Sequence, residues 1–75
     1  MIIYHVIHRY YFGERRAHEC KDHTLNYFST LEKARTCVKD CLGETAKCED
    51  DFGFEIWTSD IHDNTEYIIE MIRVY

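Results

Sequence analysis

The sequence predicts an α+β domain, in which one helix packs on a four-stranded, mainly antiparallel sheet in the order β-β-α-β-β. Four segments alternate side chains with the period of two that strands show, and one segment repeats apolar residues at steps of three and four. The 75-residue chain has no proline, repeat or low-complexity linker. We therefore expect a single domain that spans residues 1–75.

Two strands are expected before the helix. Residues 2–12 are rich in β-branched and aromatic types, and both alternating faces are apolar near the start, which is typical of a central strand. Residues 13–22 then form a polar connection. A second, shorter strand is predicted over residues 23–28.

The helix is predicted from its start, its apolar stripe and its end. Ser29-Thr30-Leu31-Glu32 has the capping-box form, in which the Ser29 hydroxyl accepts from the backbone of Glu32 and the Glu32 side chain reaches back to the Ser29 amide. Gly43 is placed to end the helix in a left-handed conformation. Between them, one stripe contains Leu31, Ala34, Cys37, Val38, Cys41 and Leu42.

The acidic second half of the chain is expected to contain two strands. Residues 44–51 are interpreted as a solvated loop with room for one more helical turn. A strand over residues 52–58 would place Phe54 and Ile56 on one face, and Glu55 and Trp57 on the other. Residues 59–64 have turn chemistry, and residues 65–75 form the last predicted strand.

This sheet has more apolar residues than one short helix can cover. Exposed aromatic side chains are expected among Tyr10, Tyr11, Trp57, Tyr67 and Tyr75, and such patches usually mark interfaces. A homodimer through the open face or an edge strand would cover them, and the alternative is that long Lys and Arg stems do so.

Charge is unevenly distributed along the chain, whose net charge is −5. Residues 44–75 contain nine acidic and two basic residues, which favours contact with a basic protein surface and disfavours direct binding of nucleic acid. The alternative is that the acids only keep a small protein soluble. The expected partner-binding residues are Glu49, Asp50, Asp51, Glu55, Trp57, Asp60, Asp63 and Glu66.

The sharpest metal-like pattern is Cys20-x2-His23-x13-Cys37-x3-Cys41. It has the rhythm of a small zinc site, with two ligands at a turn and two a turn apart on a helix. The alternative is that Cys37 and Cys41 are small core residues.

No enzyme signature is found in the sequence. Glycine-rich phosphate loops, calcium loops and the local signatures of cysteine hydrolases are missing. A domain of this size also has little room for an enclosed substrate cavity. We therefore expect a non-enzymatic protein without a cofactor.

The sequence indicates neither membrane insertion nor export. No stretch approaches the roughly 18 consecutive apolar residues that a spanning helix needs. Residues 1–9 have neither a basic start nor a small-residue cleavage site. A cytoplasmic protein with free thiols is therefore expected.

The segment Tyr27-Phe28-Ser29-Thr30-Leu31-Glu32-Lys33-Ala34-Arg35 resembles a stretch found in tiny bacterial and phage domains of unknown function. The whole chain, small and acidic, is similar in character to phage-encoded host-takeover proteins, among them anti-CRISPR proteins. This resemblance implies inhibition of a host protein. The acidic second half would then lie on a basic surface of that protein, such as the nucleic-acid groove of a defence protein. The leading hypothesis is thus an acidic protein-binding module, and the alternative is a zinc-stabilised structural or regulatory domain.

Overall fold

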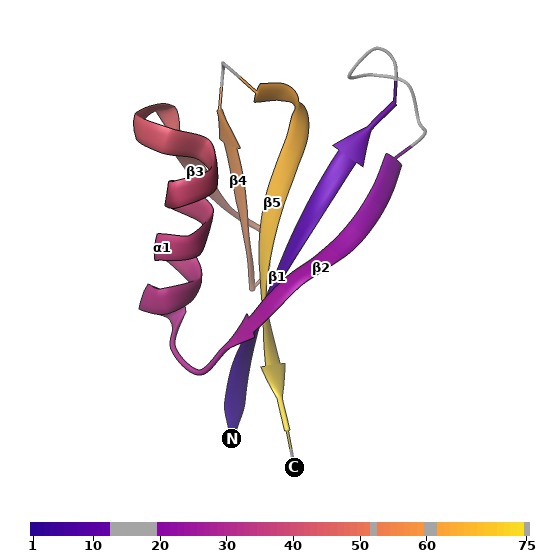
Figure 1. Ribbon diagram of the computed structural model, residues 1–75. Coiled ribbons are helices and arrows are strands. Elements are labelled where there is room, and N and C mark those ends of the chain that lie inside the picture. The colour runs from indigo at the N-terminus through magenta and orange to yellow at the C-terminus, as the bar shows by residue number, and fades with distance from the viewer. Residues whose placement is uncertain (13–19, 52, 60–61, 75) are drawn as a thin grey trace.

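The chain folds into one α-helix and a five-stranded antiparallel sheet in the computed structural model, which describes residues 1–12, 20–51, 53–59 and 62–74 (Figure 1). The α+β class is confirmed, but the sheet has one strand more than the sequence predicts. Across the sheet the order is β2-β1-β5-β4-β3. The elements are β1 (Ile2–Tyr11), β2 (Cys20–Phe28), α1 (Leu31–Leu42), a 3-10 turn (Gly43–Thr45), β3 (Lys47–Asp51), β4 (Phe54–Ser59) and β5 (His62–Arg73).

The additional strand, β3, lies within the segment predicted to be a loop. It pairs with β4 in a tight hairpin whose turn includes Gly53, at a φ of 89° that suits glycine. Acidic residues are rare in strands, but Glu49 and Asp50 lie on an edge strand and their side chains reach water. The prediction of a loop over residues 44–51 is therefore wrong for β3, whereas the extra turn is present as the 3-10 turn.

Three other strands differ from the sequence prediction only in their ends. β2 begins at Cys20, because Tyr11 at the end of β1 still pairs with Cys20. β4 runs to Ser59 and β5 begins at His62, so the connection between them is shorter than predicted.

The helix has the predicted extent but a different N-cap. Thr30, with an extended backbone, accepts a hydrogen bond from the backbone N–H of Lys33 at 3.2 Å. The cap is therefore Thr30, the second of two adjacent hydroxyl residues, and not the predicted Ser29. Gly43 follows the last turn at a φ of 76°, and its N–H donates to the carbonyl of Lys39. The positive φ is expected of a glycine that ends a helix, but the ψ of −159° lies outside the left-handed helical conformation that the sequence predicts.

The core lies between α1 and one face of the sheet. Helix α1 contacts β1, β2, β4 and β5, and it lies on a single side of the sheet (Figure 1). The buried side chains are Val6, Ala34, Val38, Leu42, Trp57 and Ile69. Because one helix covers one face, the other face of the described sheet is left open.

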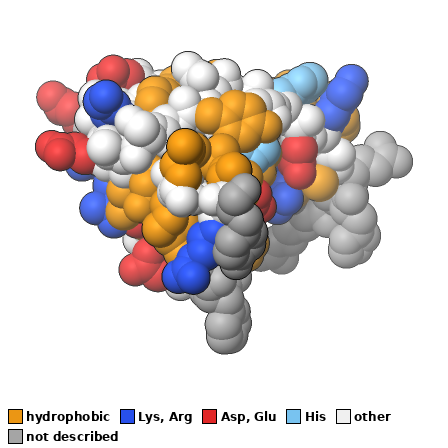
Figure 2. Space-filling model, turned by 90° about the horizontal axis from the view of Figure 1, so that it is seen from below, with side chains coloured by type: hydrophobic (Ala, Val, Ile, Leu, Met, Phe, Trp, Pro, Cys, Tyr) orange, Lys and Arg blue, Asp and Glu red, His pale blue; other side chains and the backbone are white. Residues whose placement is uncertain are grey.

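Both termini lie at the same end of the molecule (Figure 1). The backbone N–H of Val74 donates to the carbonyl of Met1 at 2.8 Å, which continues the pairing of β1 with β5. Figure 2 looks onto this end and shows hydrophobic side chains gathered across its middle, with charged side chains around them. Met1, Ile2, Met71 and Val74 are exposed large hydrophobic residues of these two chain segments.

Candidate functional site

The open face of the sheet has an apolar centre, which we call the isoleucine face. Strand register places Ile3 opposite Ile72, and Ile68 between Ile7 and Ile56. The face consists of Ile3, Ile7, Phe54, Ile56, Ile68 and Ile72. Exposure varies, since Ile68 is 6 % exposed and Phe54 is 40 % exposed. An apolar sheet face that no described helix covers is typical of an interface.

Hydrogen-bonded charged groups border this face. Arg9 donates from Nε and Nη2 to the two carboxylate oxygens of Asp22, at 2.8 and 3.1 Å. The same contact raises the pKa of Arg9 and lowers that of Asp22. On the other side of β1, the hydroxyl of Tyr11 donates to Glu66 at 3.0 Å. Burial, followed by this hydrogen bond, raises the pKa of Tyr11.

The charged side chains around the isoleucine face give it a net negative charge. His5 hydrogen-bonds Thr24 at 2.9 Å and stacks on Tyr27 with ring centroids 4.5 Å apart, and Glu70 lies 3.8 Å from its other ring nitrogen. Among the described side chains that share this face, carboxylates outnumber cations. The carboxylates are Asp22, Glu49, Glu66 and Glu70, and the cations are Arg9 and Lys47.

The face is hollowed as well as apolar. A depression of about 390 Å³ is lined by Ile7, Arg9, Asp22, Phe54, Ile56, Ile68 and Glu70. Its floor is therefore aliphatic and aromatic, and its sides are charged. This combination resembles the apolar centre and polar rim of protein interfaces.

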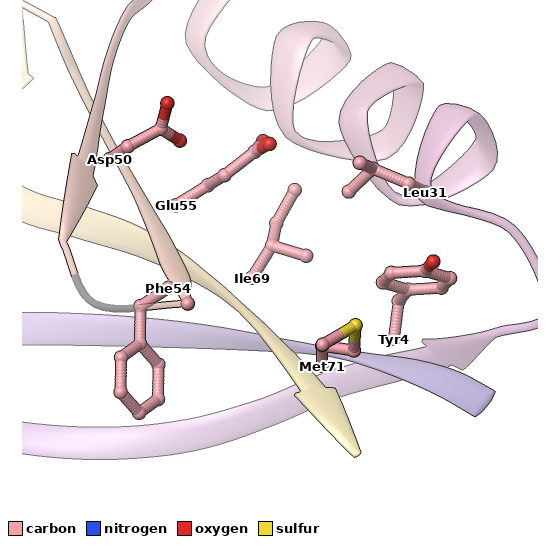
Figure 3. A pocket seen from close by; sticks show the side chains of 8 residues that line it. Tyr4, Leu31, Asp50, Phe54, Glu55, Ile69 and Met71 are labelled. Carbon is pink, nitrogen blue, oxygen red and sulfur yellow. The ribbon is translucent and has the colours of Figure 1, made fainter. Parts of the chain in front are cut away.

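A second hollow lies on the helix side of the sheet, beside the β3–β4 hairpin. We call it the Asp50 hollow. It measures about 290 Å³ and is lined by Tyr4, Leu31, Asp50, Gly53, Phe54, Glu55, Ile69 and Met71. Figure 3 shows Asp50 and Glu55 extending from neighbouring strands toward the helix side, whereas Phe54 points the opposite way. The hollow thus has aliphatic walls and carboxylates on one side.

The carboxylate of Glu55 is already paired inside the protein. Arg35 donates from Nε to both carboxylate oxygens at 3.0 and 3.2 Å and also from Nη2, while Trp57 donates from its indole nitrogen at 3.1 Å. Hydrogen bonding from Arg35 lowers the pKa of Glu55, against the opposing effect of burial. Trp57 itself is 6 % exposed and belongs to the core. Glu55 and Trp57 were expected at a partner surface, but their burial places them in the interior.

The carboxylate of Asp50 differs from that of Glu55 because no described side chain forms an ion pair with it. Ligand atoms of Cys48, Asp50 and Glu55 lie within 4.8 Å of one another. A metal ion fits this group poorly. The Glu55 carboxylate is already paired with Arg35, and partial desolvation, followed by the charges of Glu55 and Asp50, raises the pKa of the Cys48 thiol. Of these three side chains, Asp50 is therefore the one whose carboxylate can bind a cation from another molecule.

The four predicted zinc ligands are not brought together. Cys20 and His23 lie three residues apart on β2, so their side chains take opposite faces of that strand. Cys37 and Cys41 lie on α1, and burial raises the pKa of Cys37. Within the described ranges, the metal-like group of three is the one at Cys48, and it includes none of these four residues. All four cysteines of the chain are free thiols.

The predicted partner-binding acids divide into several environments. Glu49 and Asp50 are exposed on β3, and Glu66 is partly buried against Tyr11. Asp51 and Asp63 belong to β3 and β5, but their side chains, like the whole of Asp60, lie outside the described part. Sequence reasoning did not select the isoleucines as contact residues. Their alternation along β1 and β5 was a usable signal, because it placed them on shared faces.

Among the described residues, no helix has the length and apolar character that crossing a membrane requires. No family model, curated protein or solved structure matches the chain.

Proposed function

We propose that this protein is a non-enzymatic protein-binding module and that the isoleucine face is its contact surface. The observation that supports this most directly is an apolar, hollowed sheet face with a charged border and no described element over it. Buried apolar area at the centre of such a surface would supply most of the binding free energy. The charged border would set the orientation and the choice of partner.

The chemistry of the border indicates a basic partner. Carboxylates exceed cations on this face, so Lys and Arg side chains around an apolar patch would complement it. Two copies of this face would place carboxylates against carboxylates, which disfavours a face-to-face homodimer. The predicted homodimer therefore gains no support from the charges of this surface.

A host protein with a basic nucleic-acid groove is one partner of this kind. In such a complex, Glu49 and Glu66 would occupy positions that nucleic-acid phosphates otherwise take. This specific role, inhibition of a host defence protein by a phage protein, extends the proposal and has its own test. A nucleic-acid duplex added to the complex should then displace the module.

The proposal is tested by capturing partners on the immobilised protein and measuring the affinity of each purified partner for three variants. Ile72→Glu places a charge on the isoleucine face and is expected to weaken binding at least tenfold. Ile2→Glu is the matched control, because Ile2 is 39 % exposed, lies opposite Arg73 and alternates onto the helix side of the sheet. Glu49→Lys should weaken binding most at low salt, since salt screens exposed charges.

Two results would refute the proposal. One is a purified partner whose affinity is equally unaffected by Ile72→Glu and Ile2→Glu. The other is an affinity that does not change with salt or with Glu49→Lys.

A further inference from the structure

Strand β3 forms a free edge of the sheet. It pairs on one side with β4 and is last in the strand order, so no described strand lies on its outer side. The residues 47–50 are all exposed. Alternate residues of an edge strand direct their N–H and C=O groups away from the sheet. The backbone of β3 is therefore available to another extended segment.

The charges on β3 determine which charges a segment paired with it must have. Glu49 lies on the isoleucine face, because it is opposite Ile56, whereas Asp50 is opposite Glu55 on the helix side. A second copy of β3 paired antiparallel about Glu49 or about Asp50 would place that carboxylate opposite its own copy, and like charges across a strand pair are destabilising. In contrast, a partner strand with Lys or Arg on both of its faces would place one basic side chain beside Glu49 and another beside Asp50.

The Asp50 hollow adjoins this edge on the helix side. Its walls include Leu31, Ile69 and Met71 (Figure 3). Asp50 adds an exposed carboxylate that forms no ion pair with a described side chain, and its charge contributes, after that of Glu55, to the raised pKa of the nearby Arg35. Long basic side chains bury an aliphatic stem and keep the charged head near polar groups. A volume of about 290 Å³ is at the lower limit of ligand pockets and suits one such side chain.

We infer that β3 accepts an extended basic segment of a partner protein as a further strand, with one of its Lys or Arg side chains in the Asp50 hollow. The neighbouring basic residue of that segment lies beside Glu49, on the isoleucine face. This inference rests on the proposed basic partner and adds the mode of recognition, which is main-chain pairing combined with alternate side-chain pockets.

The probe for this inference is a synthetic peptide of alternating lysine and valine residues. Binding is measured by NMR titration of the full chain and of two variants. Asp50→Asn removes the carboxylate at the hollow, and Asp40→Asn is the matched control on the exposed side of α1. We expect at least tenfold weaker binding to Asp50→Asn, unchanged binding to Asp40→Asn, and slower hydrogen exchange at the outward amides of β3.

Main-chain pairing is tested by two analogues of the peptide, N-methylated at the lysines or at the valines. Since alternate amides of an added strand face its neighbour, at least one analogue should lose binding. The inference is overturned if both analogues bind like the parent peptide, if Asp50→Asn behaves like Asp40→Asn, or if the parent peptide does not bind. The proposed function is tested separately, by the effect of Ile72→Glu on the affinity of a captured partner. The inference about β3 can therefore fail while the proposed function stands.

Discussion

Replacing Glu55 by alanine tests how the helix is attached to the sheet. Glu55 is 9 % exposed and accepts hydrogen bonds from Arg35 and from the indole of Trp57. In Glu55→Ala the Trp57 N–H, in a side chain that is 6 % exposed, is left without its acceptor. Arg35 can turn to water, because its side chain is 44 % exposed.

The expected cost follows from this difference in exposure. A buried donor left without an acceptor costs about 1–3 kcal/mol, whereas the exposed guanidinium regains hydration. We therefore expect Glu55→Ala to lower the free energy of unfolding by about 2 kcal/mol. At about 4–8 °C per kcal/mol for a domain of this size, the Tm should fall by about 8–16 °C.

The assay is urea unfolding followed by circular dichroism, in the wild-type and Trp57→Phe backgrounds. Without the indole donor, Glu55→Ala should cost clearly less, so the two changes should be non-additive. An equal cost in both backgrounds would refute the assigned role of the Trp57–Glu55 bond.

The pH dependence gives an independent check on the same side chain. Hydrogen bonding from Arg35 lowers the pKa of Glu55 below its usual value of 4.5. The ionised Glu55 therefore contributes fully to the free energy of unfolding above pH 4.5, and this contribution is lost as the pH falls through the lowered pKa of Glu55. The stability gap between wild type and Glu55→Ala should narrow in acid, and a gap that widened there would contradict the ion pair.

Three further predictions concern the helix ends and a partly buried histidine. Thr30→Ala should lower stability by about 1 kcal/mol, whereas Ser29→Ala should have little effect; urea unfolding that ranked them in reverse would restore Ser29 as the cap. Gly43→Ala should cost about 1 kcal/mol or more, because its φ of 76° strains a residue with a Cβ; an unchanged Tm would count against that geometry. His8 has a buried Nε2 without a hydrogen-bond partner in the described structure, and burial followed by the charge of His23 lowers its pKa from the usual 6.5. Wild type should therefore lose stability as the pH falls below that value, and His8→Phe should remove this loss, which thermal unfolding at several pH values would show or disprove.

The helix and most of the sheet could be predicted because their signals are local. The apolar stripe from Leu31 to Leu42 and the following Gly43 fix the helix without reference to distant residues. The cap was misplaced by one position because Ser29 and Thr30 have equivalent hydroxyls, and the backbone conformation decides between them. Only local geometry, such as the extended backbone of Thr30, carries that information.

Strand β3 could not be predicted from its own composition. Its residues Lys47–Asp51 are mostly charged and lack the β-branched and aromatic types that indicate strands. Pairing with β4 across the Gly53 turn makes it a strand, and its position at the edge lets the charges remain in water. Both conditions depend on the tertiary structure, so the sequence of this segment alone predicts a loop.

The sequence analysis selected acidic side chains as contact residues and did not select the isoleucine face. Alternation correctly separated Ile56 from Glu55 and Trp57, but it does not say which face of the strand a helix will cover. Here the helix packs its apolar stripe on the face that includes Val6, Trp57 and Ile69, and Arg35 on the helix supplies the counter-ion of Glu55 on the same face. The isoleucines are consequently left on the open side.

The central claim is that the isoleucine face and the β3 edge form the contact surface. The most direct measurement is amide hydrogen exchange of the chain, free and bound to a captured partner whose affinity depends on salt. We predict that protection increases in β3 and β4 and along β5. Protection confined to α1 and β2, with β3 and β4 unchanged, would contradict the claim.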